Sequence, residues 1–342
     1  MNRNFNDIFN LLSKNARPGR IYNATKVIAS YYYSKLTKKP HHWGLPISFS
    51  IEPTTSCNLR CPQCPSGLRS FSRPTGMLSI DLFKKSIDAL HKTSGYVTLY
   101  FQGEPYLNQD FSEMVAYANS RKLYTATSSN AHYFNKENAE KTVKSGLDRI
   151  IISIDGTDQE TYAKYRKGGT LEKVLSGTRE LVEAKKRLKS KTPHIIWQFI
   201  VFAHNENQIS TIKTMAKTYN VDELALKTAQ IYDYETGSDL IPVNETFSRY
   251  AKEENNRYEI KNKLLDHCWR LWNSCVITWD GNVVPCCFDK DGTYQLGNIS
   301  NKTFKEIWDG DNYNRFRAQI LKGRRHIDIC KNCSEGTSVW KS

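Results

Sequence analysis

Three closely spaced cysteines are the residues of this sequence best suited to carry chemistry. Cys57, Cys61 and Cys64 form a C-x3-C-x2-C run just after a short segment of alternating apolar and polar residues. Three thiolates on one loop can hold three corners of a cubane iron-sulfur cluster and leave the fourth iron open. An open metal position is typical of catalysis. The alternatives are a zinc site that takes its fourth ligand from elsewhere and unligated thiols.

A second group of cysteines lies in the last quarter of the chain. Asp280 and Gly281 separate two apolar runs and predict a hairpin, and a C-x2-C pair follows near the end. Thiolates from a hairpin and a later loop can close a complete 4Fe-4S or zinc site. Residues alternate between the faces of a strand, so we expect Cys286 and Cys287 to face opposite ways. The group comprises Cys268, Cys275, Cys286, Cys287, Cys330 and Cys333.

The composition is that of an ordered globular chain, and it narrows the possible partners and cellular compartment. The 342 residues are 39% hydrophobic and 25% charged, which excludes disordered, collagen-like and low-complexity classes. The net charge of +14 would attract phosphates, an acidic substrate or electron donor, or an anionic membrane. Nine cysteines, an odd number, argue against a closed disulfide framework, and no secretion signal or membrane-spanning run is evident. We therefore expect a cytoplasmic protein.

Regular alternation of strand and helix patterns must position these cysteines. We expect strands near residues 47–52, 96–101, 124–128, 149–154, 194–201 and 223–227. Helical periodicity occupies residues 80–91, 110–121, 136–145, 171–188 and 207–219. Helical crossovers between strands indicate a parallel sheet, and six units predict a partial (β/α)6 TIM-like barrel of the α/β class. Function in such barrels lies at the carboxyl ends of the strands.

The cysteine run after the first strand of such a barrel resembles the defining motif of the radical S-adenosylmethionine (SAM) enzymes. The resemblance covers about residues 47–230, and Gln63 departs from the aromatic residue that many members carry there. It implies a SAM-binding 4Fe-4S cluster on Cys57, Cys61 and Cys64. It also implies reductive cleavage of SAM to a 5′-deoxyadenosyl radical, which abstracts a substrate hydrogen.

Further residues follow successive predicted strands and resemble the SAM contacts of that family. The segment with Gly103 and Glu104 resembles the one that meets the methionine amino group. Ser128 and Asn130 lie at the end of the third strand, where polar side chains approach the ribose. Resemblance also implies that Ser153 and Arg166 contact the SAM carboxylate, a role suited to the guanidinium fork. The resemblance does not identify a general acid or base.

The C-terminal cysteines resemble a twitch or shortened SPASM extension of radical SAM enzymes, a small α+β domain. Only nine residues follow the last cysteine, so we expect one auxiliary cluster and not two. A zinc ribbon is the alternative. Resemblance implies one auxiliary 4Fe-4S cluster on Cys268, Cys286, Cys330 and Cys333. Cys275 and Cys287 are then not needed as ligands.

We expect four regions along the chain. Residues 1–46 form a basic, amphipathic helical segment, 47–230 the barrel, 231–265 a linker with a helix over 244–265, and 266–342 the auxiliary-cluster domain. The apolar side of residues 18–38 either packs on the main domain, as most amphipathic helices do, or contacts a membrane surface or partner helix.

The residues support several functions. An enzyme that oxidises or dehydrogenates a small-molecule or carbohydrate-like substrate agrees best with them, with a flavodoxin or ferredoxin as electron donor. A radical SAM maturase of peptides or proteins is the first alternative. The others are a zinc-dependent, basic nucleic-acid-binding protein and a plain iron-sulfur electron carrier.

Overall fold

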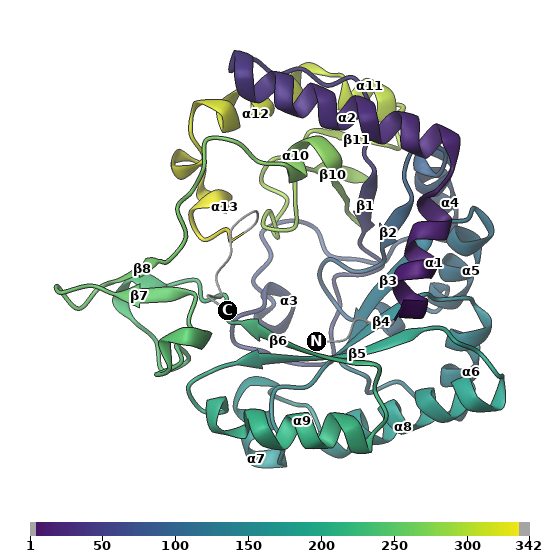
Figure 1. Ribbon diagram of the computed structural model, residues 1–342, viewed down its shortest axis with the longest axis vertical. Helices are drawn as coiled ribbons and strands as arrows, with labels where there is room; N and C mark the ends of the chain where they lie inside the picture. The colour runs from purple at the N-terminus through teal and green to yellow at the C-terminus, as the bar shows by residue number, and fades with distance from the viewer. Residues whose placement is uncertain (1–4, 335–342) are drawn as a thin grey trace.

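Six parallel strands form the central layer of the protein. The computed structural model describes residues 5–334; residues 1–4 and 335–342, the outer ends of the expected N-terminal segment and C-terminal domain, lie outside the described residues. Each strand pairs with the next in parallel, giving the predicted open partial barrel (Figure 1). The strands are β1 (Ser48–Ile51), β2 (Tyr96–Thr98), β3 (Tyr124–Ser129), β4 (Arg149–Ser153), β5 (His194–Val201) and β6 (Glu223–Thr228).

Helices connect the strands and cover the outside of the barrel. Several begin at side-chain caps: Ser79, Asn135 and Asp158 each accept a hydrogen bond from a backbone N–H in the first turn. The predicted helices are confirmed to within two or three residues at their ends. They are α4 (Ile80–Leu90), α5 (Phe111–Ser120), α6 (Lys136–Lys144), α8 (Leu171–Arg187) and α9 (Ile209–Thr218). A further short helix, α7 (Gln159–Tyr165), was not predicted.

Alternation along each strand divides the barrel into an apolar outer face and a more polar lumen. Phe49 and Val97 point outward and are fully or nearly fully buried under the helices. Ser50 and Thr98 are directly paired across β1 and β2 and line a cavity in the lumen. The apolar core therefore lies between sheet and helices, and space for a ligand lies inside the barrel.

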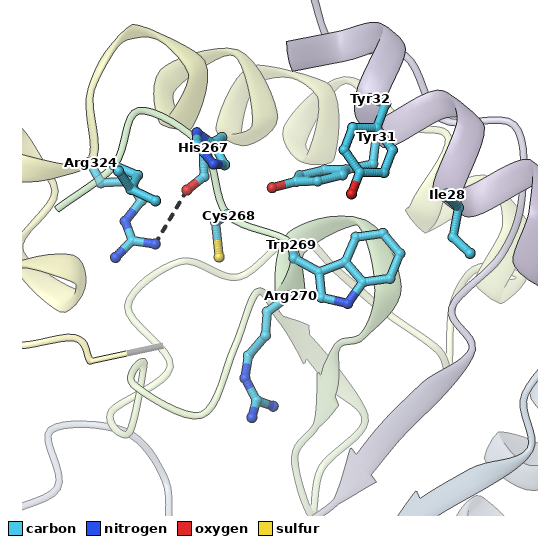
Figure 2. Close-up of a pocket in the computed structure, with 9 residues that line it drawn as sticks. Ile28, Tyr31, Tyr32, His267, Cys268, Trp269, Arg270 and Arg324 are labelled. Carbon is cyan, nitrogen blue, oxygen red and sulfur yellow. Dashed lines mark hydrogen bonds between the residues drawn. The ribbon is translucent and has the colours of Figure 1, made fainter. Parts of the chain in front are cut away.

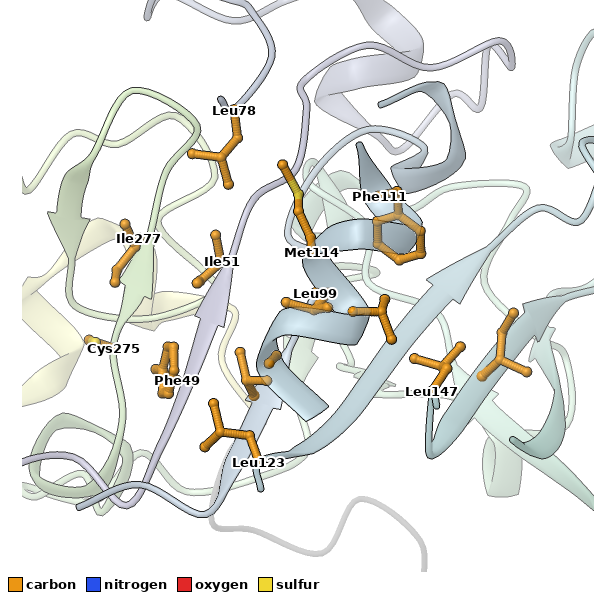
Figure 3. Packing of buried hydrophobic residues seen from close by; sticks show 14 of the residues in the cluster. Phe49, Ile51, Leu78, Leu99, Phe111, Met114, Leu123, Leu147, Cys275 and Ile277 are labelled. Atoms are coloured by element: carbon orange, nitrogen blue, oxygen red, sulfur yellow. The ribbon is translucent and has the colours of Figure 1, made fainter. Parts of the chain in front are cut away.

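The C-terminal domain extends the barrel sheet. Strand β9 (Val276–Ile277) pairs in parallel with β1, β10 (Asn282–Val284) returns antiparallel to β9, and β11 (Gly297–Asn298) pairs with β10. This confirms the predicted hairpin, whose turn contains Gly281 with a φ of 85°. Ile51 lies beside Ile277, and Phe49 lies beside Cys275, in one continuous core (Figure 3). In the described part of the domain, four α-helices accompany these strands: α10 (Arg270–Asn273), α11 (Phe304–Trp308), α12 (Asp311–Lys322) and α13 (Asp328–Lys331).

The helix predicted over residues 244–265 is wrong. This segment contains the antiparallel strands β7 (Tyr250–Lys252) and β8 (Tyr258–Ile260). Asn256 adopts a φ of 62° at the turn, a conformation that asparagine tolerates better than most residues. The polar composition suits a helix, but the Asn-rich turn and the Tyr and Ile residues at its edges favour a hairpin.

Two N-terminal helices lie at the amino ends of the strands. These are α1 (Phe5–Asn15) and α2 (Pro18–Thr37), at the right and top of Figure 1. Lys14 pairs with Asp148, which directly precedes β4, and the Arg20 guanidinium donates to the carbonyl of Lys122, which closely precedes β3. Among the described residues, no helix is long and apolar enough to cross a membrane.

Candidate iron-sulfur and SAM site

The loop with the first three cysteines follows β1 at the carboxyl edge of the barrel. Cys64 precedes the short helix α3 (Pro65–Leu68), and its N–H donates to the carbonyl of Cys61. A Cβ on Gly67 would lie 2.6 Å from the backbone N and O of Cys61, so only glycine permits this close approach. The loop also contacts the segment between α7 and α8, because the N–H of Arg60 donates to the carbonyl of Lys167.

The three thiols are chemically suited to iron. All nine cysteines are free. The N–H of Leu59 donates to Cys57 Sγ at 3.4 Å, and Arg166 Nη1 lies 3.9 Å from Cys61 Sγ, so both sulfurs have donors that stabilise a thiolate. Burial raises the pKa of the Cys57 thiol to about 12, so the proton stays on until a metal displaces it. The donor set fits the cluster that the motif implies.

Glu104 is the central polar group beside this loop. It is 2% exposed and accepts hydrogen bonds at 2.8 Å from the Ser129 hydroxyl and the Asn130 N–H. Burial raises its pKa to about 7, although these donors oppose the shift. Gly103 holds a φ of 74°, and a Cβ there would lie 2.3 Å from the carbonyl oxygen of Thr54. This turn presents a buried carboxyl that could receive an ammonium group.

The predicted residues at the carboxyl ends of β3 and β4 either face the lumen or contact the cysteine loop. Ser128 and Ser153 occupy positions of the strands that face the lumen, by alternation from Ala126 and Arg149. Asn130 instead donates through Nδ2 to Asn58 Oδ1 at 2.8 Å, which ties β3 to the cysteine loop. The structure therefore brings Gly103, Glu104 and Asn130 together with this loop.

Arg166 has a buried partner that the sequence analysis missed. Its Nε lies 2.5 Å from Asp155 Oδ2, and the two side chains are 13% and 0% exposed. The other Asp155 oxygen accepts the N–H of Ile200 at 2.7 Å. The pair directs the guanidinium toward Cys61, because the same side chain reaches Cys61 Sγ. The only available signal was the position of Asp155 just beyond β4.

Gln63 and Lys290 are further residues at the mouth whose contacts the sequence did not indicate. Gln63 Oε1 accepts the N–H of Tyr232, which joins the cysteine loop to the segment after β6. Lys290 donates to the Tyr232 hydroxyl at 2.8 Å, and burial lowers the pKa of its amine. Residues far apart in the sequence thus meet at the barrel mouth.

A polar cavity of about 530 Å³ occupies the lumen next to the C-terminal domain. Its lining combines strand residues such as Ser50 and Thr98 with Tyr100, Arg270 and Cys287. Cys286 lines a different cavity, which agrees with the prediction that these neighbouring cysteines face opposite ways.

The four C-terminal cysteines implied as cluster ligands line one small, largely apolar cavity. Cys275 is not among them; it is 2% exposed within the hydrophobic core. Among the described residues, no three His, Cys, Asp or Glu side chains converge as ligands of a single metal ion. A cubane cluster takes each thiolate at a separate iron, so four cysteines around a common cavity suit it. The set is Cys268, Cys286, Cys330 and Cys333.

Cys268 also borders a second, outer pocket of about 540 Å³, which Figure 2 shows. Tyr31 of α2 packs edge-on against Trp269 there, with ring centroids 5.0 Å apart. Arg324 donates to the carbonyl of His267 at 3.3 Å beside the cysteine. The N-terminal helices thus contact the segment that carries this thiol.

Fold and cysteine pattern together define an iron-sulfur enzyme built on a partial barrel. The model of the radical SAM superfamily matches residues 51–217, and the model of SPASM, an iron-sulfur cluster-binding domain, matches residues 268–334. The chain belongs to the radical SAM enzymes with a C-terminal SPASM domain. Membership in this family decides against two alternatives that the sequence left open, a zinc-dependent nucleic-acid-binding protein and a plain electron carrier.

Known relatives agree with this assignment. The chain is 27% identical over 319 residues to the tungsten-containing aldehyde ferredoxin oxidoreductase cofactor-modifying protein of Pyrococcus furiosus, covering 83% of this chain and 86% of that protein. BtrN in complex with AdoMet and 2-DOIA shares the fold, with a TM-score of 0.52, 18% identity and coverage of 87% and 96%. SuiB of Streptococcus suis, bound to S-adenosylmethionine, has a TM-score of 0.64, 14% identity and coverage of 94% and 80%.

Proposed function

We propose that this radical SAM enzyme dehydrogenates a small, polar substrate held in the lumen of the barrel. The observation that carries the proposal is the cavity of about 530 Å³ between β1, β2 and the SPASM domain. Its hydroxyl groups, together with Arg270, suit a ligand rich in oxygen atoms. A cavity of this size fits one small molecule.

The residues at the mouth have separate roles in this proposal. Cys57, Cys61 and Cys64 would hold the SAM-binding 4Fe-4S cluster. Cluster and SAM, when bound, supply the 5′-deoxyadenosyl radical that removes a substrate hydrogen. Glu104 would accept the methionine ammonium, and Arg166, oriented by its pair with Asp155, would bind the SAM carboxylate.

Three further polar residues complete the proposed SAM site. Gly103 provides the turn that presents the carboxyl, and Asn130 ties β3 to the cysteine loop. Ser128 would approach the ribose from the lumen face, and Ser153 would assist at the SAM carboxylate.

The SPASM domain would hold one auxiliary 4Fe-4S cluster on the four cysteines that share a cavity. Four protein ligands leave no iron free for substrate, which favours transfer of the electron released in dehydrogenation. A flavodoxin or ferredoxin would reduce the SAM-binding cluster. The positive charge of the chain suits such an acidic donor.

The names of two relatives support a small substrate. The Pyrococcus furiosus relative is named for modifying the cofactor of another enzyme. BtrN forms a complex with AdoMet and 2-DOIA. Peptide modification is the second candidate, because anSMEcpe bound to AdoMet and the Cp18Cys peptide also shares this fold, with a TM-score of 0.58.

Measurement of 5′-deoxyadenosine tests the proposal. The anaerobically reconstituted enzyme is incubated with SAM, a reductant and either the small-molecule or the peptide fraction of a cell extract. We expect the small-molecule fraction to raise 5′-deoxyadenosine formation and a product two hydrogens lighter to appear. Stimulation by the peptide fraction alone would contradict a small-molecule substrate and would support a peptide maturase.

Two variants locate the reaction. Cys61→Ala should abolish SAM cleavage altogether. Ser50→Trp fills the lumen and should remove the stimulation while leaving SAM binding intact, whereas Ser120→Trp, at an exposed helix end, should change neither. Cleavage of SAM by the Cys61→Ala protein would contradict the proposed site.

A further inference from the structure

Helix α2 packs on the barrel with its polar side, against the usual pattern of an amphipathic helix. Arg20 and Asn23 are 4% and 6% exposed, and Ser30 and Ser34 are fully buried. These groups have partners: Asn23 donates to the carbonyl of Leu45 at 2.8 Å, and the Ser34 hydroxyl lies within hydrogen-bond distance of two carbonyl oxygens. Internal hydrogen bonds thus hold the inner side of the helix.

The apolar side of the same helix consequently faces outward. Only Val27 and Tyr31 of its apolar stripe are buried, so the expected packing of that stripe on the main domain is largely wrong. Residues 5–43 hold ten of the fifteen exposed large hydrophobic side chains in the described part of the chain. Single exposed apolar residues are ordinary, but a concentration of this kind marks an interaction surface. These ten are Phe5, Phe9, Leu12, Ile21, Tyr22, Ile28, Tyr32, Tyr33, Leu36 and Trp43.

The segment that carries this surface is almost entirely positive in its own charges. Asp7 is the only acidic residue before Glu52, and it is buried in an ion pair with Arg149. Lys26 and Lys35 lie over the rings of neighbouring tyrosines of α2, at 5.4 and 5.9 Å from the ring centroids. Lysines with apolar stems along aromatic rings and ammonium groups at the rim suit the boundary between acyl chains and lipid headgroups.

We propose that α1 and α2 dock the enzyme on an anionic lipid bilayer. The exposed phenylalanines and leucines would enter the acyl boundary, and the tyrosines and Trp43 would lie at the headgroup level. Lysine residues near the surface would bind anionic headgroups by charge attraction. The helices would lie on the membrane without crossing it.

The position of these helices is compatible with turnover at a membrane. They contact residues that precede β2, β3 and β4, at the amino ends of the strands, whereas the loop with Cys57 follows the carboxyl end of β1. A docked molecule would therefore direct the barrel mouth away from the lipid.

Anionic lipid fits this surface better than other occupants. A second copy of the chain would bring two basic surfaces together, which like charges oppose. A nucleic acid would pair with the lysines but would leave aliphatic side chains such as Leu12, Ile28 and Leu36 exposed to water.

Co-sedimentation of the full, reconstituted chain with vesicles tests the proposal. We expect binding to vesicles of phosphatidylcholine mixed with phosphatidylglycerol, weak binding to phosphatidylcholine alone, and loss of binding as salt rises. The double variant Tyr32→Ser and Leu36→Ser should lower the partition coefficient at least about tenfold. Val243→Ser is the matched control, because Val243 is 82% exposed, like Leu36, but lies outside the helices.

Charge reversal provides an independent arm. Lys35→Glu with Lys38→Glu should weaken binding to the anionic vesicles at least about tenfold. Lys189→Glu with Lys191→Glu, at exposed positions between α8 and β5, should not. SAM cleavage should be the same in all variants. Absence of binding at low salt, or equal losses in test and control variants, would overturn the proposal. So would a dimer that the Leu36→Ser change dissociates, or tighter binding to nucleic acid than to vesicles.

Discussion

Single residues at the barrel mouth combine burial with complete hydrogen bonding. The Glu104 carboxyl lies in the interior with donors at both oxygens, and Asp155 has Arg166 on one oxygen and a backbone N–H on the other. Buried carboxylates of this kind are stable only because their partners are in place. Such preorganisation suits a site that must hold a charged ligand in one orientation.

Affinity for SAM should depend on pH through Glu104. Burial raises its pKa to about 7, so the carboxylate that would accept the ammonium forms as pH rises through that value. We expect the Kd for SAM to fall between pH 6 and 8, and Glu104→Gln to weaken binding and flatten the profile. Equilibrium dialysis of the reconstituted protein measures this, with exposed Glu113→Gln as the control.

The same shift has the opposite consequence for folding. A carboxyl group whose pKa is higher in the folded state than in the unfolded chain takes up protons on folding. Its contribution to stability is therefore largest below its ordinary pKa and is lost as pH rises through about 7.

The prediction for SAM affinity has a clear contrary outcome. A Glu104→Gln protein that kept the wild-type pH profile of SAM binding would show that Glu104 does not contact SAM.

Short elements with close backbone contacts determine the shape of the cysteine loop and the base of the barrel. Helix α3 lies against Cys61 at its glycine, and the Arg20 side chain of α2 reaches carbonyls at the ends of two barrel helices. Neither contact extends a regular hydrogen-bonding pattern. Each depends on one residue of the right size or donor geometry.

Gly67→Ala should disturb the cluster loop without unfolding the barrel. The new methyl group would lie 2.6 Å from the backbone of Cys61, so α3 or the loop must move. We expect the iron bound at the first site to fall at least about threefold, since ligand geometry controls cluster assembly. Iron analysis and circular dichroism measure the two effects. Gly19→Ala, whose new methyl group would lie 3.8 Å from the carbonyl oxygen of Lys92, should leave both unchanged.

Arg20→Ala should destabilise the protein by about 2–4 kcal/mol, because several buried carbonyl oxygens lose a charged donor. The guanidinium donates to the carbonyls of Lys14, His91 and Lys122 at 2.5, 2.7 and 2.8 Å. Thermal or denaturant unfolding would measure the loss. Arg17→Ala, at an exposed position, should change stability by less than about 0.5 kcal/mol. Equal effects of the two variants would contradict the proposed role of Arg20.

On the scale of the whole molecule, barrel and SPASM domain share one sheet and one core. Pairing of β9 with β1 continues the sheet, and Ile277 packs with Ile51. The proposed clusters therefore occupy a connected scaffold, and residues of both the barrel and the SPASM domain line the lumen cavity. This arrangement gives a bound substrate a defined position relative to both.

Metal analysis should show two clusters with independent ligands. Reconstituted protein is expected to hold about eight iron and eight sulfide per chain, and Cys333→Ala about four of each. SAM cleavage without substrate should persist in that variant, because its cysteine lies outside the proposed SAM site. Cys287→Ser should retain both clusters, since Cys287 lines the lumen cavity. Loss of the SAM-binding cluster from Cys333→Ala would contradict the separation.

The sequence by itself determined the order of the strands, most helix positions and the two cysteine groups. Periodicity and turn chemistry act between near neighbours, so they can be read without the fold. The cysteine spacing works in the same way, because one loop carries three thiols. The family followed from these local patterns.

Only the tertiary structure decided which surfaces meet. The Arg166–Asp155 pair, the addition of β9 to β1 and the outward apolar side of α2 join or expose residues according to long-range packing. The hairpin at Tyr250 shows the same limit, since its polar composition also suits a helix. Such choices depend on the total free energy of competing contacts, which local patterns do not contain.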